Sequence, residues 1–155
     1  MDVIEKKAID IKRADEFDLD LLYEFEGLLF ESNAWGLESL RSCVTEPTQL
    51  ALVARDEDDA PLGYLTGSFL PDGAELFRIG VLPWHRRLGV GRALLEHFFA
   101  DARAAGAERV LVEVRVSNET ARAFYASMGA IEITRRRHYY RAPEEDAVIL
   151  EIALV

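Results

Sequence analysis

A glycine- and arginine-rich segment near the middle of this 155-residue chain, residues 83–92, sets the narrowest limits on its fold; it reads PWHRRLGVGR. An apolar stretch with the length and composition of a strand precedes it at residues 75–82. Apolar residues at helical spacing follow from 90 to 105, and a strand pattern with valine at 110, 112 and 114 covers 108–116. This succession predicts a parallel pair of strands joined by a right-handed crossover.

The rest of the chain alternates between strand and helix patterns without repeats or long linkers. Strands are predicted at 8–13, 49–55, 62–70, 131–134 and 147–154, and helices at 19–29, 37–44 and 118–127. The predicted order is β-α-α-β-β-β-α-β-α-β-β. Because short turns between strands favour antiparallel hairpins, we predict an α/β fold on a mixed sheet with helices on both faces. We expect a single domain covering residues 1–155.

Composition narrows the classes of protein to which the chain can belong. Half of the residues are apolar and 30% are charged, which is typical of a soluble globular protein. No apolar run approaches the ~18–20 residues that span a bilayer, and the first residues lack an apolar signal core. We therefore expect a cytoplasmic protein that does not bind membranes. The lone Cys43 cannot form an internal disulfide and is expected to pack in the core, and His85, His97 and His138 lack the spacing of metal ligands.

Charge is distributed unevenly along the chain. Residues 1–77 carry 6 basic and 18 acidic side chains, whereas residues 78–155 carry 12 basic and 10 acidic ones. This division suggests that the second half binds an anion and the first half a cationic partner, although drift in composition explains it equally well. A net charge of −10 with one short basic cluster, residues 135–137, argues against binding of nucleic acid.

The residue types in the segment 83–92 suit a diphosphate. Gly89 and Gly91 allow the backbone to approach a ligand, and a helix that begins beside them presents unpaired N–H groups with partial positive charge. Arg86, Arg87 and Arg92 add fixed positive charge. The segment is not a Walker loop, because no Gly-Lys-Ser/Thr follows, and it is not the Gly-x-Gly-x-x-Gly loop of dinucleotide-binding proteins. A purely structural role for the two glycines is the alternative.

Two motifs make a family resemblance specific. The string RxxGxGRALL from residue 86 resembles motif A of the GCN5-related N-acetyltransferase (GNAT) superfamily, and residues 118–129, NETARAFYASMG, resemble its motif B. Residues 112–115, 136–140 and 145–147 are similar to the RimI-type branch of ribosomal-protein-alanine N-acetyltransferases. The resemblance covers residues 75–155 well and residues 1–74 in outline only, with Trp35 where that branch has Pro-Trp.

The chain departs from the pattern of that branch at several positions. Arg86 replaces a glutamine, Arg78 stands where asparagine is common, residues 128–130 read MGA in place of LGF, and Glu144 replaces a glycine. These differences concern packing and the loop around the substrate, and they leave the type of reaction unchanged.

The resemblance implies the GNAT acyl-CoA N-acyltransferase fold and direct attack of a substrate amine on acetyl-CoA, with no metal. It implies that the cofactor is bound by Ile79, Gly80, Val81, Arg86, Arg87, Leu88, Gly89, Val90, Gly91, Arg92 and Asn118. The pyrophosphate would lie on residues 86–92 and the pantetheine arm along residues 79–81, where the N–H near Val81 is the candidate oxyanion donor.

The resemblance also assigns the chemistry and the substrate. Glu113 would be the general base, Tyr125 the acid for the departing thiolate, and Trp35, Tyr139 and Tyr140 the walls around the substrate. The implied acceptor is the N-terminal α-amino group of a basic protein, possibly a ribosomal protein that starts with alanine, and acids such as Glu26 on the first helices would attract it. A small-molecule amine acetyltransferase is the alternative, and a non-catalytic acyl-CoA sensor is the third interpretation. The sequence does not predict the oligomeric state.

Overall fold

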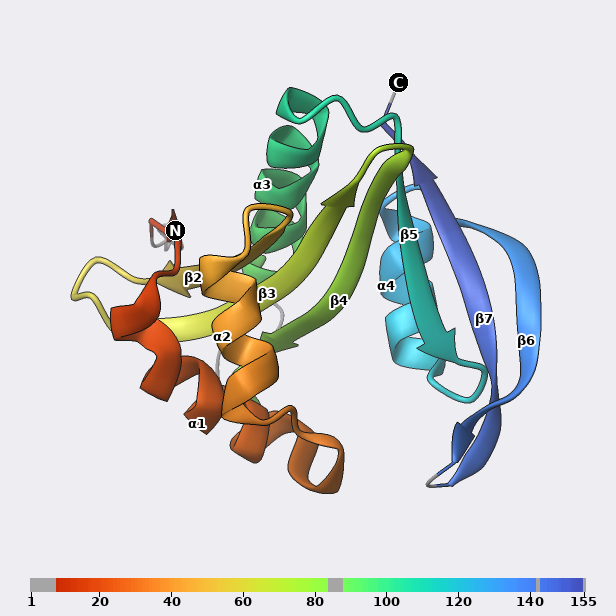
Figure 1. The fold of residues 1–155 in the computed structure, drawn as a ribbon, viewed down its shortest axis with the longest axis horizontal. Helices are drawn as coiled ribbons and strands as arrows, with labels where there is room; N and C mark the ends of the chain where they lie inside the picture. The colour runs from red at the N-terminus through yellow and green to blue at the C-terminus, as the bar shows by residue number, and fades with distance from the viewer. Residues whose placement is uncertain (1–7, 84–87, 142, 155) are drawn as a thin grey trace, which may run out of the picture. The chain divides into compact units, whose positions relative to one another are not determined.

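The computed structural model describes residues 8–83, 88–141 and 143–154 (Figure 1). Its helices and strands follow the predicted order, with one short 3-10 turn before the first helix and another after it. The strands are β1 Asp10–Arg13, β2 Gln49–Arg55, β3 Pro61–Leu70, β4 Gly73–Val81, β5 Arg109–Arg115, β6 Ile131–Arg141 and β7 Glu144–Ala153. The helices are η1 Glu16–Asp18, α1 Leu19–Phe30, η2 Glu31–Asn33, α2 Leu37–Thr45, α3 Val90–Ala104 and α4 Glu119–Ser127.

The strands form one mixed sheet in the order β1-β2-β3-β4-β5-β7-β6. β4 and β5 are parallel, with Leu76 opposite Val112, so the predicted strand–helix–strand crossover is confirmed. The pairs β1–β2, β5–β7 and β6–β7 are antiparallel. The predicted end of the sixth strand at residue 134 is wrong, because β6 continues to Arg141. Residues 131–139 of this edge strand are all exposed, so no alternation of buried residues marks its extent in the sequence.

The chain divides into two compact units. One contains Met1–Thr66 and Arg78–Phe98, and the other contains Gly67–Phe77 and Phe99–Val155. A single domain that covers the whole chain therefore stays a prediction.

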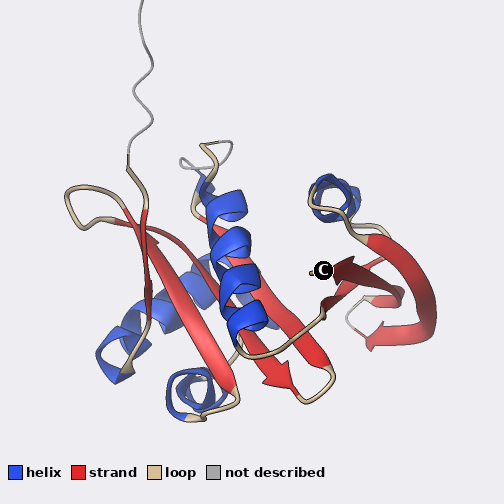
Figure 2. Cartoon of the chain, turned by 90° about the horizontal axis from the view of Figure 1, so that it is seen from above, coloured by secondary structure: helices blue, strands red, loops and turns tan. Residues whose placement is uncertain are grey.

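In the first unit, α1 and α2 lie on one side of the strands and α3 on the other (Figures 1 and 2). Ala51 and Val53 of β2 pack in one cluster with Leu22, Phe25 and Leu40 of the two helices. The alternate residues of β2 are also buried, because side chains along a strand point to opposite faces in turn. Burial on both faces explains why β2 reads in the sequence as a continuous apolar run.

In the second unit, β5 separates a buried face from one that is accessible. Val110, Val112 and Val114 are at most 5% exposed and pair with apolar residues of β7. Their neighbours Leu111, Glu113 and Arg115 point to the opposite face and are only partly buried. The strand thus holds a carboxylate on the accessible side of a rigid apolar sheet.

Candidate active site

The predicted phosphate segment ends in a helix N-terminus that can hold an anion. Gly89 has φ +83°, and the space around a Cβ at this position is open for 4 Å. The helix bond from Ala93 N–H to the Gly89 carbonyl (3.0 Å) places the N–H groups of residues 90–92 in the first turn of α3, where backbone N–H groups have no acceptor within the helix. Exposed Leu88 precedes this turn, and the Arg92 guanidinium, which is also exposed, lies 3.7 Å from Glu96. Two further predicted ligands, Arg86 and Arg87, lie outside the described residues.

Close packing explains why the predicted pantetheine strand, residues 79–81, contains a glycine at position 80. A Cβ on Gly80 would lie 2.7 Å from Leu29 Cδ1 and 2.8 Å from Tyr64 Cε1. A Cβ on Gly63, in the neighbouring strand, would lie 2.6 Å from the carbonyl oxygen of Gly80. Only glycine allows β3, β4 and α1 to approach this closely. Ile79 and Val81 are partly buried, and cofactor binding by their backbone stays a prediction.

Glu113, the predicted base, lies on the accessible face of β5 with its side chain 24% exposed. Its Oε1 is 3.8 Å from Arg136 Nη1, and the carboxylate accepts a hydrogen bond from the Tyr139 hydroxyl. This hydrogen bond is the main cause of the raised pKa of Tyr139. The structure therefore brings the predicted base together with one predicted substrate-wall residue, and the catalytic role of Glu113 stays a prediction.

A second carboxylate, which the sequence analysis missed, acts on the same face. Glu75 of β4 lies opposite Leu111, so its side chain shares the face of β5 that carries Glu113. Burial raises the pKa of Glu75, the negative charge of Glu113 raises it further, and the positive charge of Arg136 opposes both effects. The alternation along β4 places Glu75 on one face, but only the register between the strands reveals its neighbour.

Tyr125, the predicted acid, is buried in α4. Its side chain is 6% exposed, and burial, followed by the nearby hydroxyl of Tyr140, raises its pKa. Its ring lies 5.4 Å from that of Phe124, and Tyr140 itself lies under the guanidinium of Arg115, 4.2 Å from the ring centroid. A phenol in this setting keeps its proton at neutral pH, which is the form that a general acid requires.

A β-bulge sets the direction of the two tyrosines of β6. The register with β7 shifts between Arg136 and Tyr140, and within this stretch His138 has φ +51°, a conformation that is rare for a residue with a side chain. The His138 N–H donates a 2.9 Å hydrogen bond to Asp146 Oδ1 and stabilises the bulge. The rings of Tyr139 and Tyr140 lie 5.2 Å apart at 86°. Two of the three predicted wall residues therefore form one aromatic pair, and their role as substrate walls stays a prediction.

The turn between β5 and α4 is fixed by hydrogen bonds to side chains. Asn118 caps α4 through a 3.1 Å bond from the Ala121 N–H to its Oδ1. The neighbouring Ser117 N–H donates to Glu145 Oε1 (2.5 Å), and Arg115 Nη1 lies 3.5 Å from Glu145 Oε2. The hydrogen bonds from Ser117 are the main cause of the lowered pKa of Glu145. Binding of the cofactor by Asn118 stays a prediction, and its Oδ1 already serves the helix.

One prediction about the first helices is wrong. Glu26 was expected to be a surface acid that attracts a basic substrate, but its side chain is fully buried on the inner face of α1. It lies in the same unit as the half-buried Trp35, whose backbone N–H donates a 2.9 Å hydrogen bond to Glu26 Oε2. The spacing of Glu26 from Leu22 and Leu29 is that of the apolar face of the helix, but a buried carboxylate requires tertiary partners, which the sequence of one helix does not reveal.

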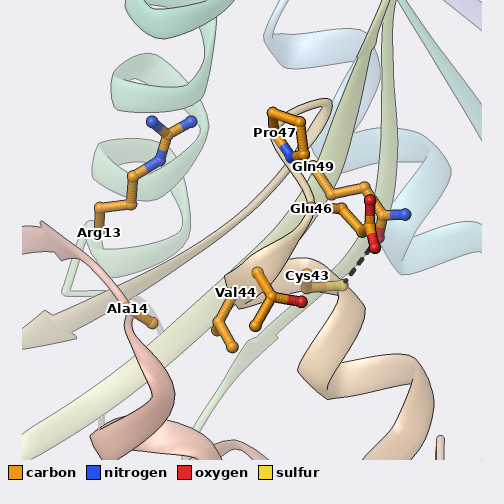
Figure 3. Close-up of a pocket in the computed structure, with 8 residues that line it drawn as sticks. Arg13, Ala14, Cys43, Val44, Glu46, Pro47 and Gln49 are labelled. Atoms are coloured by element: carbon orange, nitrogen blue, oxygen red, sulfur yellow. Dashed lines mark hydrogen bonds between the residues drawn. The ribbon is translucent and has the colours of Figure 1, made fainter.

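A shallow pocket of about 200 Å³ in the first unit contains none of the predicted site residues (Figure 3). Its lining includes Cys43, which is 2% exposed and whose thiol lies 3.5 Å from Gln49 Oε1. Burial is the main cause that raises the pKa of this thiol to about 11. The prediction that Cys43 is a packing residue is therefore confirmed.

The residues described do not assemble a metal site. In 8–83, 88–141 and 143–154 there is no group of three or more His, Cys, Asp or Glu side chains that could hold an ion. His97 is half-buried in α3, and His138 Nδ1 lies 2.5 Å from Glu144 Oε1. His85 lies outside the described residues. Among the helices of the described ranges, none is long and apolar enough to cross a membrane.

Comparison with known proteins identifies the family. The sequence profile of the acetyltransferase (GNAT) family matches residues 15–130. The [ribosomal protein bS18]-alanine N-acetyltransferase of Escherichia coli K12 is 44% identical over 85 residues, which are 54% of this chain and 57% of that protein, so the match spans little more than half of the relative. The putative enzyme of the same description from Bacillus subtilis is 28% identical over 88% of this chain and 90% of its own length.

Solved structures agree with the sequence comparison. The crystal structure of the ribosomal-protein-S18-alanine N-acetyltransferase from Escherichia coli has a TM-score of 0.84 and 31% identity, covering 95% of this chain and 94% of that one. Arabidopsis thaliana NAA60 in complex with acetyl-CoA has the same fold, with a TM-score of 0.83, at 16% identity over 94% and 98% of the two chains. The mixed sheet, the crossover through α3 and the profile match have one explanation: this chain belongs to the acetyltransferase (GNAT) family.

Proposed function

We propose that this protein is an acetyl-CoA-dependent N-acetyltransferase that acetylates the N-terminal α-amino group of a protein, a ribosomal protein that starts with alanine. The observation that carries the proposal is the similarity at 31% identity, over nearly the whole of both chains, to a ribosomal-protein-S18-alanine N-acetyltransferase. The contact between Glu113 and Tyr139 supports it, since it places a carboxylate beside an aromatic wall. Acetyl-CoA would supply the acetyl group as an activated thioester.

The residues at the start of α3 fit the pyrophosphate of that cofactor. Gly89 in the left-handed region, the N–H groups of the first helical turn and the exposed Arg92 together suit a doubly charged anion. Arg86 and Arg87 would add charge. The strand residues 79–81 would hold the pantetheine arm through their backbone, and the Val81 N–H would stabilise negative charge on the thioester oxygen.

In the reaction, Glu113 would accept the proton that the α-amine loses as its nitrogen bonds to the acetyl carbon. An α-amino group has a pKa near ~8 and a lysine near ~10.4, so deprotonation at pH 7 costs roughly 1.4 and ~4.6 kcal/mol respectively. One partly exposed carboxylate, 3.8 Å from Arg136, is a sufficient base for the first group. This difference favours an N-terminus over a lysine side chain as the acceptor.

Tyr125 would complete the transfer as the acid. When the carbon–sulfur bond breaks, its hydroxyl would give a proton to the thiolate, and water would restore that proton afterwards. The burial that raises the pKa of Tyr125 keeps it protonated until this step. No covalent acetyl-enzyme is needed, because the amine attacks the thioester directly.

The charge distribution supports a basic partner. Residues 1–77 hold 18 acidic and 6 basic side chains, and acids on α1 such as Asp20 and Glu24 are exposed, unlike Glu26. Electrostatic attraction of this kind increases association rates with basic proteins. Ribosomal proteins are basic, so one of them fits this charge distribution. We therefore propose that the protein acts in the cytoplasm, where such a partner is made.

The test is transfer from acetyl-CoA to a set of peptides that differ only in their first residue. Peptides starting with Ala, Ser or Met, and a blocked peptide that starts with acetyl-Ala and contains Lys, are compared by the release of free coenzyme thiol. We expect the highest kcat/KM with Ala. Preferential modification of the blocked peptide would refute the N-terminal assignment, and transfer to small amines alone would favour the small-molecule alternative.

A further inference from the structure

A fully buried carboxylate in the first unit, that of Glu26, has three partners from other elements and turns of the chain. Glu26 of α1 is 0% exposed. Its Oε1 accepts a 2.6 Å hydrogen bond from the Tyr64 hydroxyl, and its Oε2 accepts the 2.9 Å bond from the Trp35 N–H. Arg78 Nε lies 3.5 Å from Oε1. Because a buried charge without partners is strongly destabilising, each of these groups is tied to the position of Glu26.

Arg78 extends this network to the turn that follows α1. Its guanidinium carbon lies 4.1 Å from the ring centroid of Phe30 and 5.3 Å from that of Trp35. Its Nη2 also donates a hydrogen bond to the carbonyl oxygen of Asn33. A planar cation that contacts two aromatic rings and a carbonyl at once holds all three in one arrangement.

The turn itself, residues 31–36, depends on this support. Glu31 has φ +45°, which is unfavourable for a residue with a side chain, and η2 covers only Glu31–Asn33. The internal bond from the Ala34 N–H to the Glu31 carbonyl measures 3.1 Å. The hydrogen bonds from Trp35 to Glu26 and from Arg78 to the Asn33 carbonyl therefore fix the position of Trp35 in the turn between α1 and α2.

We propose that Arg78 and Glu26 are positioning residues that set Trp35 and thereby the selectivity for the first residue of the acetyl acceptor. This inference rests on the proposed function and on the prediction, made from the family resemblance, that Trp35 is one of the walls around the acceptor. Arg78 does not touch the reacting atoms; it acts through the turn 31–36. Its loss allows Trp35 to move, so the site no longer distinguishes alanine from a larger first residue.

The experiment compares wild type, Arg78→Gln and Arg78→Lys with peptides that start with Ala or Met. Lys restores the charge beside Glu26 but not the planar contacts with the rings. We expect Arg78→Gln to raise KM for the Ala peptide by about tenfold, which corresponds to the loss of one such contact. We also expect the Ala/Met ratio of kcat/KM to fall, and kcat and KM for acetyl-CoA to stay within about twofold. Arg78→Lys should recover only part of the ratio. Arg109→Gln, which removes the 3.0 Å ion pair with Glu151, is the matched control and should leave the ratio unchanged.

A double-mutant cycle separates positioning from general destabilisation. In the Trp35→Ala background, Arg78→Gln should have almost no further effect on the Ala/Met ratio, because the group through which it acts is gone. Additive effects, or an equal loss of kcat/KM for both peptides, would overturn the inference. Thermal unfolding of each variant establishes that it is folded at the assay temperature, and Arg78→Lys serves if Arg78→Gln does not fold.

A measurement without substrate keeps the inference testable if the proposed function fails. In a Trp84→Phe background, Trp35 is the only tryptophan, and quenching of its fluorescence by acrylamide reports its accessibility. We expect Arg78→Gln to increase the quenching constant by about twofold or more, as for a side chain released from packing. Unchanged quenching would refute the positioning role whatever the enzyme acetylates. Failure of all peptides with increased quenching would instead refute the proposed function alone.

Discussion

Replacing Gly80 with alanine tests how closely the proposed cofactor strand packs on the first helix. The new Cβ would lie 2.7 Å from Leu29 Cδ1 and 2.8 Å from Tyr64 Cε1, both shorter than real contacts of a Cβ. The tip of Leu29 can turn aside, but the Tyr64 ring is 0% exposed and stacks on Phe25 at 5.1 Å. The backbone or the ring must therefore shift, which costs about 1–3 kcal/mol in the free energy of unfolding.

The matched control is the same substitution at Gly27, within α1. A Cβ at Gly27 has open space for 4 Å, so Gly27→Ala gains helix propensity without a clash. We expect it to stabilise the protein by up to about 1 kcal/mol. Thermal unfolding followed by circular dichroism measures both variants, and for a chain of this length about 1 kcal/mol corresponds to ~2–4 °C in Tm. An unchanged Tm for Gly80→Ala, or a lower Tm for Gly27→Ala, would contradict this account of the packing.

Three further predictions concern the chemistry. Tyr125→Phe should lower kcat by about 10²-fold or more while KM for acetyl-CoA changes little, measured by initial rates; unchanged kcat would remove the acid assignment. Glu113→Gln, which keeps an acceptor for the Tyr139 hydroxyl, should lower kcat/KM by about 10²–10⁴-fold, and a loss below about fivefold would contradict the base assignment. The Cys43 thiol, with its pKa raised to about 11, should react slowly with iodoacetamide at pH 8 and faster as the pH approaches 11. Alkylation is followed by mass spectrometry, and rapid alkylation at pH 8 would show that the thiol is not buried.

The elements that the sequence predicted well are those with a buried face. Val110, Val112 and Val114 recur at every second position, and the same alternation appears in the burial of β5. β6 has no buried face along 131–139, so its sequence carried no signal beyond the first few residues. The predicted order of elements is nevertheless correct, because β6 was predicted as a strand and only its length was wrong.

The candidate site was predictable where chemistry depends on residue type and local sequence. Gly89, with its positive φ, directly precedes α3, and Asn118 directly precedes α4, close to where the sequence predicted that these helices begin. The partners of Glu26, however, come from residues 9, 38 and 52 positions further along the chain. The spacing of Glu26 from Leu22 and Leu29 already placed it on the apolar face of the helix, whereas its partners follow only from packing.

The most direct test of the central claim locates the acetyl group on one peptide that offers both kinds of amine. The peptide starts with a free alanine and contains an internal lysine, and it is incubated with acetyl-CoA and wild-type protein at pH 7. Tandem mass spectrometry then identifies the modified nitrogen. The proposed function predicts one acetyl group on the α-nitrogen of alanine, with the modification greatly reduced in Glu113→Gln. Acetylation of the lysine, with the alanine amine left free, would contradict it.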